Sequence, residues 1–373
     1  MTVRSLFSGI SILFVVIQGQ AIEQINGRDS LVLKGTRAQL VVDLSGGSIA
    51  SFQLLEQPLN PLSWNTPSSG DKSIHGFGHF LCLDRWGPPS EAEGKNGMPY
   101  HGEASSVPWT GQMETVTGKL HAELSATLPL AGLSIRRTLT MPQDVPFVWV
   151  QETVKNTNRL GRILNMVQHP SIAAPFLDAS TLIDCNGRKG FAQGNPMPNP
   201  EEPTSLWPRA INRDGVAADI RHLTADHDPN VVSYVIDEAL GWVTAVNPGK
   251  ELLIGYVWNT SEYPWVSHWR NSEKGQPTAR GLEFGTTGLH QPFPILTKKQ
   301  TIFGRQLFEY LDANESRTKS YGFFLMKVPR DFGGVEKLTL RNHQITVEER
   351  STQTPRVINM QLPKTLGLPP GLE

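Results

Sequence analysis

The chain has 373 residues, and 34 Lys and Arg against 35 Asp and Glu leave a formal net charge of −1. This near-balance argues against nucleic acid or an anionic membrane as the main partner, because both require a basic surface. Charged residues make up 18% and hydrophobic residues 38%, which excludes a coiled coil and a disordered chain. The 34 glycines and 28 prolines indicate a folded chain that is rich in turns.

The N-terminal residues have the three-part pattern of a secretory signal peptide. Residues 1–4 carry a positive charge, residues 6–17 are mostly apolar, and the small residues Gly19 and Ala21 suit positions −3 and −1 of a cleavage site. The apolar run is shorter than the ~20 residues that cross a bilayer. We therefore expect cleavage after Ala21, no stable membrane span after removal, and a mature chain that is secreted or periplasmic.

The two cysteines, Cys82 and Cys185, allow one disulfide at most. An oxidising compartment would permit that bridge. Two unpaired buried thiols are the favoured interpretation, because the sequence does not give their separation in space.

The hydrophobic pattern along the mature chain is that of β-strands. Residues 38–43 and 48–55 alternate apolar and polar side chains around Gly46-Gly47, which predicts a hairpin. Residues 119–169 give the strongest signal and predict three or four long antiparallel strands. Further strands are predicted over residues 231–236, 242–246, 252–258, 301–311, 319–328, 337–340 and 344–349.

No run of helical periodicity extends over three turns, so we predict an all-β fold, a large antiparallel β-sandwich. We expect one domain over residues 22–362 and a frayed tail over residues 363–373. Residues 184–228 are rich in Pro and Asn and are interpreted as one long loop, either functional or a solvated connector.

Two segments in the first half of the chain carry candidate chemistry. Residues 78–87 and 98–104 place His, Arg, Asp, Trp and Tyr among glycines, a mixture that suits a polar pocket with an aromatic platform. His169 stands where a predicted strand meets a loop, so its ring could exchange a proton near neutral pH.

Two more segments lie in the second half. Trp258, Trp265, His268 and Trp269 fall within a dozen residues, and such rings stack on the apolar face of a sugar. Glu283 is a lone carboxylate in an apolar strand, a setting that raises the pKa of a Glu. Each feature also has a structural interpretation: His169 as a hydrogen-bonded residue, Glu283 as an ion-pair partner, the tryptophans as core.

The order of these segments resembles that of the aldose 1-epimerase, or galactose mutarotase-like, family. The similarity is carried by the opening Gly46-Gly47 hairpin, by "TLTMP" and "VQETVKNT" between residues 138 and 157, and by Gln168-His169-Pro170 and Gly281-Leu282-Glu283. By motif, the resemblance implies that His101, His169 and Glu283 are catalytic, with Arg85 binding the sugar. It also implies a β-supersandwich fold. Asp184 and Asp228 are candidates by position for the family's substrate-binding aspartate.

The resemblance implies acid-base catalysis of sugar anomer interconversion without metal or organic cofactor. Glu283 would take the proton of the anomeric hydroxyl while a protonated His169 donates to the ring oxygen, and His101 and Arg85 would bind sugar oxygens. The expected partner is a sugar or oligosaccharide.

Three rival hypotheses stay open. A non-catalytic carbohydrate-binding domain needs the tryptophans but not the His169 and Glu283 pair. A polysaccharide lyase could use Tyr100, His101 and Arg85 on the same fold. A zinc site at His75 and His79 is disfavoured, because Gly76 and Gly78 oppose the helix that would bring the two rings together.

Overall fold

A computed structural model describes residues 22–193, 202–222, 228–351 and 353–368. The predicted signal peptide and its cleavage site lie outside these residues, as do Asn195–Pro200 and Pro369-Pro370. In the described ranges, no helix has both the length and the apolar character needed to cross a bilayer.

The described residues form two large sheets, and the larger has 15 strands. Its strands are β1 (Glu23–Ile25), β2 (Arg28–Lys34), β3 (Ala38–Asp43), β4 (Ile49–Leu54), β5 (His79–Asp84), β10 (Arg162–Ile172), β12 (Lys189–Ala192), β13 (Ser205–Leu206), β14 (Arg209–Ile211), β15 (Ala217–Asp219), β16 (Val231–Val235), β19 (Trp265–Glu273), β20 (Gln276–Gly281), β21 (Glu283–Gly285) and β24 (Glu309–Leu311).

The second large sheet has eight strands in the described part of the chain. They are β6 (Thr110–Val116), β7 (Lys119–Leu128), β8 (Leu133–Pro142), β9 (Phe147–Asn156), β11 (Leu182–Cys185), β17 (Leu240–Asn247), β18 (Leu252–Asn259) and β25 (Ser316–Lys327).

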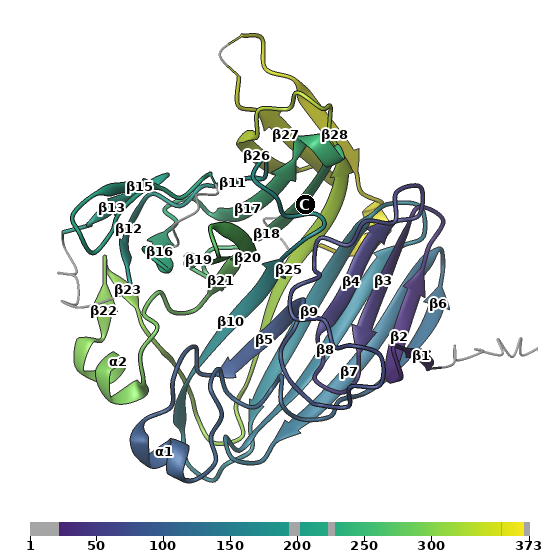
Figure 1. Ribbon diagram of the computed structural model, residues 1–373. Helices are drawn as coiled ribbons and strands as arrows, with labels where there is room; N and C mark the ends of the chain where they lie inside the picture. The colour runs from purple at the N-terminus through teal and green to yellow at the C-terminus, as the bar shows by residue number, and fades with distance from the viewer. Residues whose placement is uncertain (1–21, 194–201, 223–227, 352, 369–373) are drawn as a thin grey trace, which may run out of the picture.

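Small elements lie at the two ends of the sandwich. A three-stranded sheet lies at the top of the view in Figure 1, and α1 lies at the bottom. These elements are β26 (Val335–Arg341), β27 (Gln344–Glu349), β28 (Val357–Gln361), the pair β22 (Thr301–Ile302) and β23 (Arg305–Gln306), the helices α1 (Glu91–Lys95) and α2 (Phe293–Lys299), and two 3₁₀ turns (Pro248–Lys250 and Lys364–Leu366).

The two large sheets pack face to face because their strands alternate apolar and polar side chains. In β7 the residues Leu120, Ala122 and Leu124 are buried while their neighbours are partly exposed. Opposite-face alternation of this kind gives each sheet one apolar face that must be covered. A single cluster of buried side chains joins the faces, and the rings of Phe52 on β4 and Phe323 on β25 meet at 5.1 Å. The predicted all-β sandwich is confirmed.

The strand predictions are confirmed where apolar and polar residues alternate over a long segment. Strands β3 and β4 pair antiparallel, as expected for the hairpin, and β7, β8 and β9 form a meander with β10 next along the chain. Cys82 and Cys185 are free thiols, both buried.

Two interpretations were wrong. Residues 184–228 are not one loop, because they contain the short strands β12 to β15, two to four residues each. Residues 301–311 form three short strands, since Phe303 and Gly304 both have positive φ and turn the chain. The chain packs as far as residue 368, since Leu366 and Leu368 are buried in a cluster with side chains of the small sheet and of the eight-stranded sheet.

Candidate active site

Strand β10 is buried on both faces, and its side chains point alternately into the core and toward a pocket. Gln168 points into the core, where its Nε2 donates to Glu152 Oε2 (2.6 Å). The neighbouring His169 therefore points to the opposite face of the sheet. There it meets the apolar group formed by Phe80, Cys82, Trp86 and Val167.

Three side chains form a row across β5, β10 and β21. His169 lies directly opposite Phe80 in the antiparallel register, and the two rings stack with centroids 4.3 Å apart. On the other side, Val167 pairs with Gly285 and Gln168 with Phe284, so Glu283 follows as the cross-strand neighbour of His169. The distance from His169 Nε2 to Glu283 Oε1 is 3.4 Å.

The Glu283 carboxyl is buried and is held from one side. Its Oε2 accepts a hydrogen bond from Trp86 Nε1 at 2.6 Å. Burial raises the pKa of Glu283 to about 8, although the Trp86 hydrogen bond opposes that rise. Gly281 leaves room for the carboxyl, because a Cβ at that position would stand 2.8 Å from Glu283 Oε1.

The His169 ring is buried and has a local partner. Its Nδ1 lies 2.9 Å from Ser171 Oγ, and that hydroxyl lies 3.3 Å from the His169 carbonyl oxygen. Burial lowers the pKa of His169 to about 3, so the imidazole is neutral at neutral pH.

His101 enters the pocket from the loop that follows α1. The loop bends sharply, with φ of 66° at His101 and 77° at Gly102, where a Cβ would collide with the Leu83 carbonyl oxygen. His101 N–H donates to Gly87 O (3.0 Å), and Gly87 N–H donates to His101 Nδ1 (3.1 Å). Since Nδ1 accepts, the neutral ring carries its proton on Nε2. Burial lowers the pKa of His101 well below its usual value.

These side chains line one pocket of about 500 Å³. His101, His169 and Glu283 come together in it, and Trp269 is the one predicted stacking residue that reaches it. Among the described residues that line the pocket, none is Lys or Arg. The full lining is Trp64, Phe80, Trp86, Tyr100, His101, His169, Gln193, Asn230, Val231, Trp269, Glu283 and His290.

Sequence reasoning missed much of the lining, with His290 the most notable omission. Its Nε2 lies 3.1 Å from Tyr100 Oη, and burial lowers the pKa of His290 to about 4. The sequence signal was faint, because His290 lies in an irregular segment between β21 and α2. Trp64 also gave no local signal, yet its ring meets that of Trp269 edge-on at 5.2 Å.

Three residues predicted to bind the sugar lie elsewhere. Trp258 is fully buried and stacks on Phe284 at 4.2 Å, inside the main core. Trp265 is fully buried in a separate apolar cluster, and His268 is fully buried beside Trp207. His268 faces away from the pocket, because its side chain alternates with that of Trp269 along β19. Trp265 lies on the same face of β19 as Trp269, but an apolar cluster that includes Leu289 and Leu296 covers it. Trp258 lies on β18, in the other large sheet.

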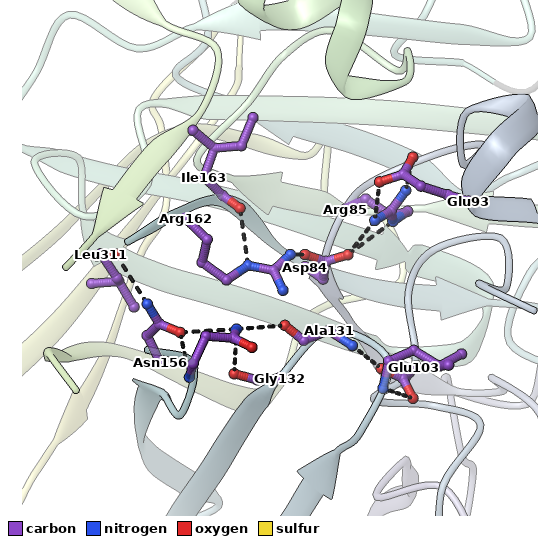
Figure 2. Close-up of polar contacts among 12 residues, drawn as sticks. Asp84, Arg85, Glu93, Glu103, Ala131, Gly132, Asn156, Arg162, Ile163 and Leu311 are labelled. Carbon is purple, nitrogen blue, oxygen red and sulfur yellow. Dashed lines mark hydrogen bonds and ion pairs between the residues drawn. The ribbon is translucent and has the colours of Figure 1, made fainter. Parts of the chain in front are cut away.

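Arg85 is also outside the pocket. Figure 2 shows its guanidinium between Asp84, 2.9 Å from Nε, and Glu93, 2.7 Å from Nη1. Arg162 pairs with the other oxygen of Asp84. Arg85 therefore anchors α1 to the sheet and is not available to a ligand in the pocket.

The two aspartates that were candidates by position, Asp184 and Asp228, are also paired with arginines. Asp184 is buried and pairs with Arg221 at 2.6 Å, while Asp228 pairs with Arg213 at 2.9 Å. Neither lines the pocket. No group of three or more His, Cys, Asp or Glu side chains in the described ranges is placed to hold a metal ion, and the buried His79 ring contacts Gln168.

Solved structures with this architecture identify the fold. A galactose mutarotase-like protein from Clostridium acetobutylicum superposes with a TM-score of 0.60 at 14% identity, over 84% of this chain and 98% of that chain. The chain has the galactose mutarotase-like fold. A Klebsiella pneumoniae protein described provisionally as an aldose 1-epimerase gives a TM-score of 0.59 at 13% identity, over 84% of this chain and 83% of that chain.

A third relative has the same mutarotase-like fold. A galactose mutarotase-like protein from Lactobacillus casei matches with a TM-score of 0.53 at 16% identity, over 80% of this chain and all of that chain. No protein-family model and no curated protein matches the sequence. At these identities the likeness gives the fold, and the chemistry rests on the pocket itself.

Proposed function

We propose that this protein is an exported, carbohydrate-active enzyme that interconverts the anomers of an aldose. The observation that carries the proposal is the row of Phe80, His169 and Glu283 with His101 on the same pocket wall. Opening a sugar hemiacetal requires an acid-base pair, while a hydrogen-bond donor and aromatic rings hold the sugar in place.

The chemistry needs two coordinated proton transfers. One group takes the proton from the anomeric hydroxyl while another gives a proton to the ring oxygen, so the C1–O5 bond breaks and a carbonyl forms. Each such group contributes about 10²- to 10⁴-fold. His169 Nε2 and Glu283 Oε1 are 3.4 Å apart, close enough for both to reach one hemiacetal centre. His101 Nε2–H is the donor available to an oxygen that gains charge.

Non-catalytic sugar binding is the second candidate, supported by the Trp64 and Trp269 rings at the pocket. Those rings alone would bind a sugar without any acid-base pair. A lyase acting on uronic acid polymers has less support, because Arg85, its expected carboxylate neutraliser, is paired with Asp84 and Glu93.

Two-dimensional exchange NMR tests the proposal. A panel of neutral aldoses is incubated with the mature protein, and the rate of exchange between anomers is measured against protein concentration. An enzyme gives a rate that rises in proportion to protein concentration above spontaneous mutarotation. Sugar binding without a protein-dependent rate, for every aldose that binds, would favour the carbohydrate-binding candidate.

A further inference from the structure

The two oxygens of Glu283 have different partners, and this fixes where a proton can lie. Trp86 Nε1–H can only donate, so Glu283 Oε2 is an acceptor at 2.6 Å. Glu283 Oε1 faces His169 Nε2 and is the oxygen left to carry a proton.

The His169 ring is oriented by Ser171. The Ser171 hydroxyl has one hydrogen, which it donates to the His169 carbonyl oxygen. The same Oγ then accepts from His169 Nδ1 at 2.9 Å. A neutral ring protonated on Nδ1 presents an unprotonated Nε2 to Glu283.

The surroundings of the pair favour neutral forms. Glu283 and His169 are buried, and burial without a counter-ion disfavours a charge on either. Burial raises the pKa of Glu283 to about 8 and lowers that of His169 to about 3. The ionisable groups that interact with the pair in the described part of the chain are His79, Cys82, Tyr100, His101 and His290.

None of these neighbours supplies a charge near neutral pH. Burial lowers the pKa of each of the three histidines, and it raises the pKa of Tyr100 to about 12 and that of Cys82 well above its usual value. Among the described residues, a carboxylate at Glu283 would therefore have only His169 as a cationic partner.

We propose that Glu283 and His169 rest as a neutral pair in which the proton between Glu283 Oε1 and His169 Nε2 lies on Glu283 Oε1, and that Trp86 is the positioning residue that confines this proton to that oxygen. Ser171 has the matching role for His169, since it holds the ring proton on Nδ1.

The consequence for catalysis rests on the function proposed above. Glu283 begins as the acid and His169 as the base, opposite to the roles that the sequence resemblance implies. His169 Nε2 takes the anomeric hydroxyl proton, Glu283 Oε1–H protonates the ring oxygen, the C1–O5 bond breaks and C1=O1 forms. The pair is left as imidazolium and carboxylate, and ring closure returns both protons.

Infrared difference spectroscopy on the sugar-free protein tests the resting state. Protein carrying ¹³C-labelled glutamate is compared with Glu283→Gln at about pH 6 and about pH 10. We expect one protonated-carboxyl band in the wild type at the lower pH that the variant lacks, and its loss at the higher pH. A Glu283 that is ionised at the lower pH would overturn the proposal.

Trp86→Phe tests the positioning residue. It removes the hydrogen bond that favours the carboxylate, so the midpoint of the Glu283 band should rise by about one pH unit. Trp269→Phe is the matched control, because Trp269 contacts the His169 ring without a hydrogen bond to Glu283, and its midpoint should not move. An unmoved midpoint in Trp86→Phe would overturn the role of Trp86.

Histidine ¹⁵N NMR provides an independent measurement if Trp86→Phe does not fold. His169→Asn assigns the signal. The wild type should show protonated Nδ1 and unprotonated Nε2, and Ser171→Ala should shift the ring toward the Nε2–H tautomer. A doubly protonated or Nε2–H wild-type ring would overturn the proposal. These measurements are made without sugar. A separate finding that the protein does not accelerate anomer exchange would therefore contradict the proposed function but not the neutral pair.

Discussion

His169 and Glu283 are cross-strand neighbours on β10 and β21, with 3.4 Å between Nε2 and Oε1. The sheet register sets this contact, because Val167 and Gln168 pair with Gly285 and Phe284 in the same ladder. A one-residue slip in register would send one of the two side chains to the core face. The contact between the two side chains therefore depends on this register.

Glu283→Gln should abolish most anomer exchange while sugar binding persists. Gln keeps the shape of the side chain and a partner for Trp86 but cannot exchange a proton with substrate. We expect the exchange rate to fall by about 10² or more with little change in affinity, measured by exchange NMR and calorimetry. Wild-type-like exchange in this variant would remove the epimerase assignment.

The stability of the folded protein should fall as pH rises through the Glu283 titration. The folded-state pKa of about 8 lies above the ordinary value of 4.5, so the unfolded chain releases this proton first. Between those values the group should cost roughly 1 kcal/mol of unfolding free energy per pH unit. Urea unfolding of wild type and Glu283→Gln checks it, since the difference should grow with pH, and parallel curves would contradict it.

The fold was predictable because its signal is local and repeated. The alternation of Leu120, Ala122 and Leu124 marks a half-buried strand in any context. Strands buried on both faces were harder, because β5 shows no alternation and its His79 to Asp84 stretch suggested a polar pocket. That prediction holds in part, since Phe80 lines the pocket whereas His79 and Asp84 do not.

The site was predictable only in part. Motif order gave His101, His169 and Glu283. The sugar-binding role expected of Arg85, Trp258 and Trp265 depended on the distant segments that pair with or cover each side chain, and that of His268 on the strand face that it takes. Single residues do not reveal that face. Arg85 shows the difficulty, because its partner Asp84 is adjacent in sequence, but Glu93 and Arg162 reach the cluster through folding (Figure 2).

Trp269→Ala should weaken sugar binding without unfolding the protein. Trp269 is partly exposed at the pocket, so losing its ring should cost about 1 to 3 kcal/mol of binding free energy. Trp258→Ala is the contrasting control, because removing that core ring should cost about 3 to 5 kcal/mol of unfolding free energy. Calorimetric titration and thermal unfolding check both, and an unfolded Trp269→Ala would mean that its ring is structural.

Export should leave a mature chain that begins at Ile22. Gly19 and Ala21 provide the small residues that signal peptidase requires at −3 and −1. N-terminal sequencing of protein recovered from the exported fraction is the measurement. Retention of Met1 in that fraction would contradict the prediction.

His169→Asn and Glu283→Gln should not be additive. The two residues act on one pair of coupled proton transfers, so removing either interrupts the same step. Each single variant should lose about 10²-fold or more in exchange rate, and the double variant should be little slower than the slower single variant. Independent contacts would instead give losses that multiply. Exchange NMR on the wild type and the three variants, with the aldose that binds best, distinguishes the outcomes, and multiplicative losses would show that His169 and Glu283 do not work as a unit.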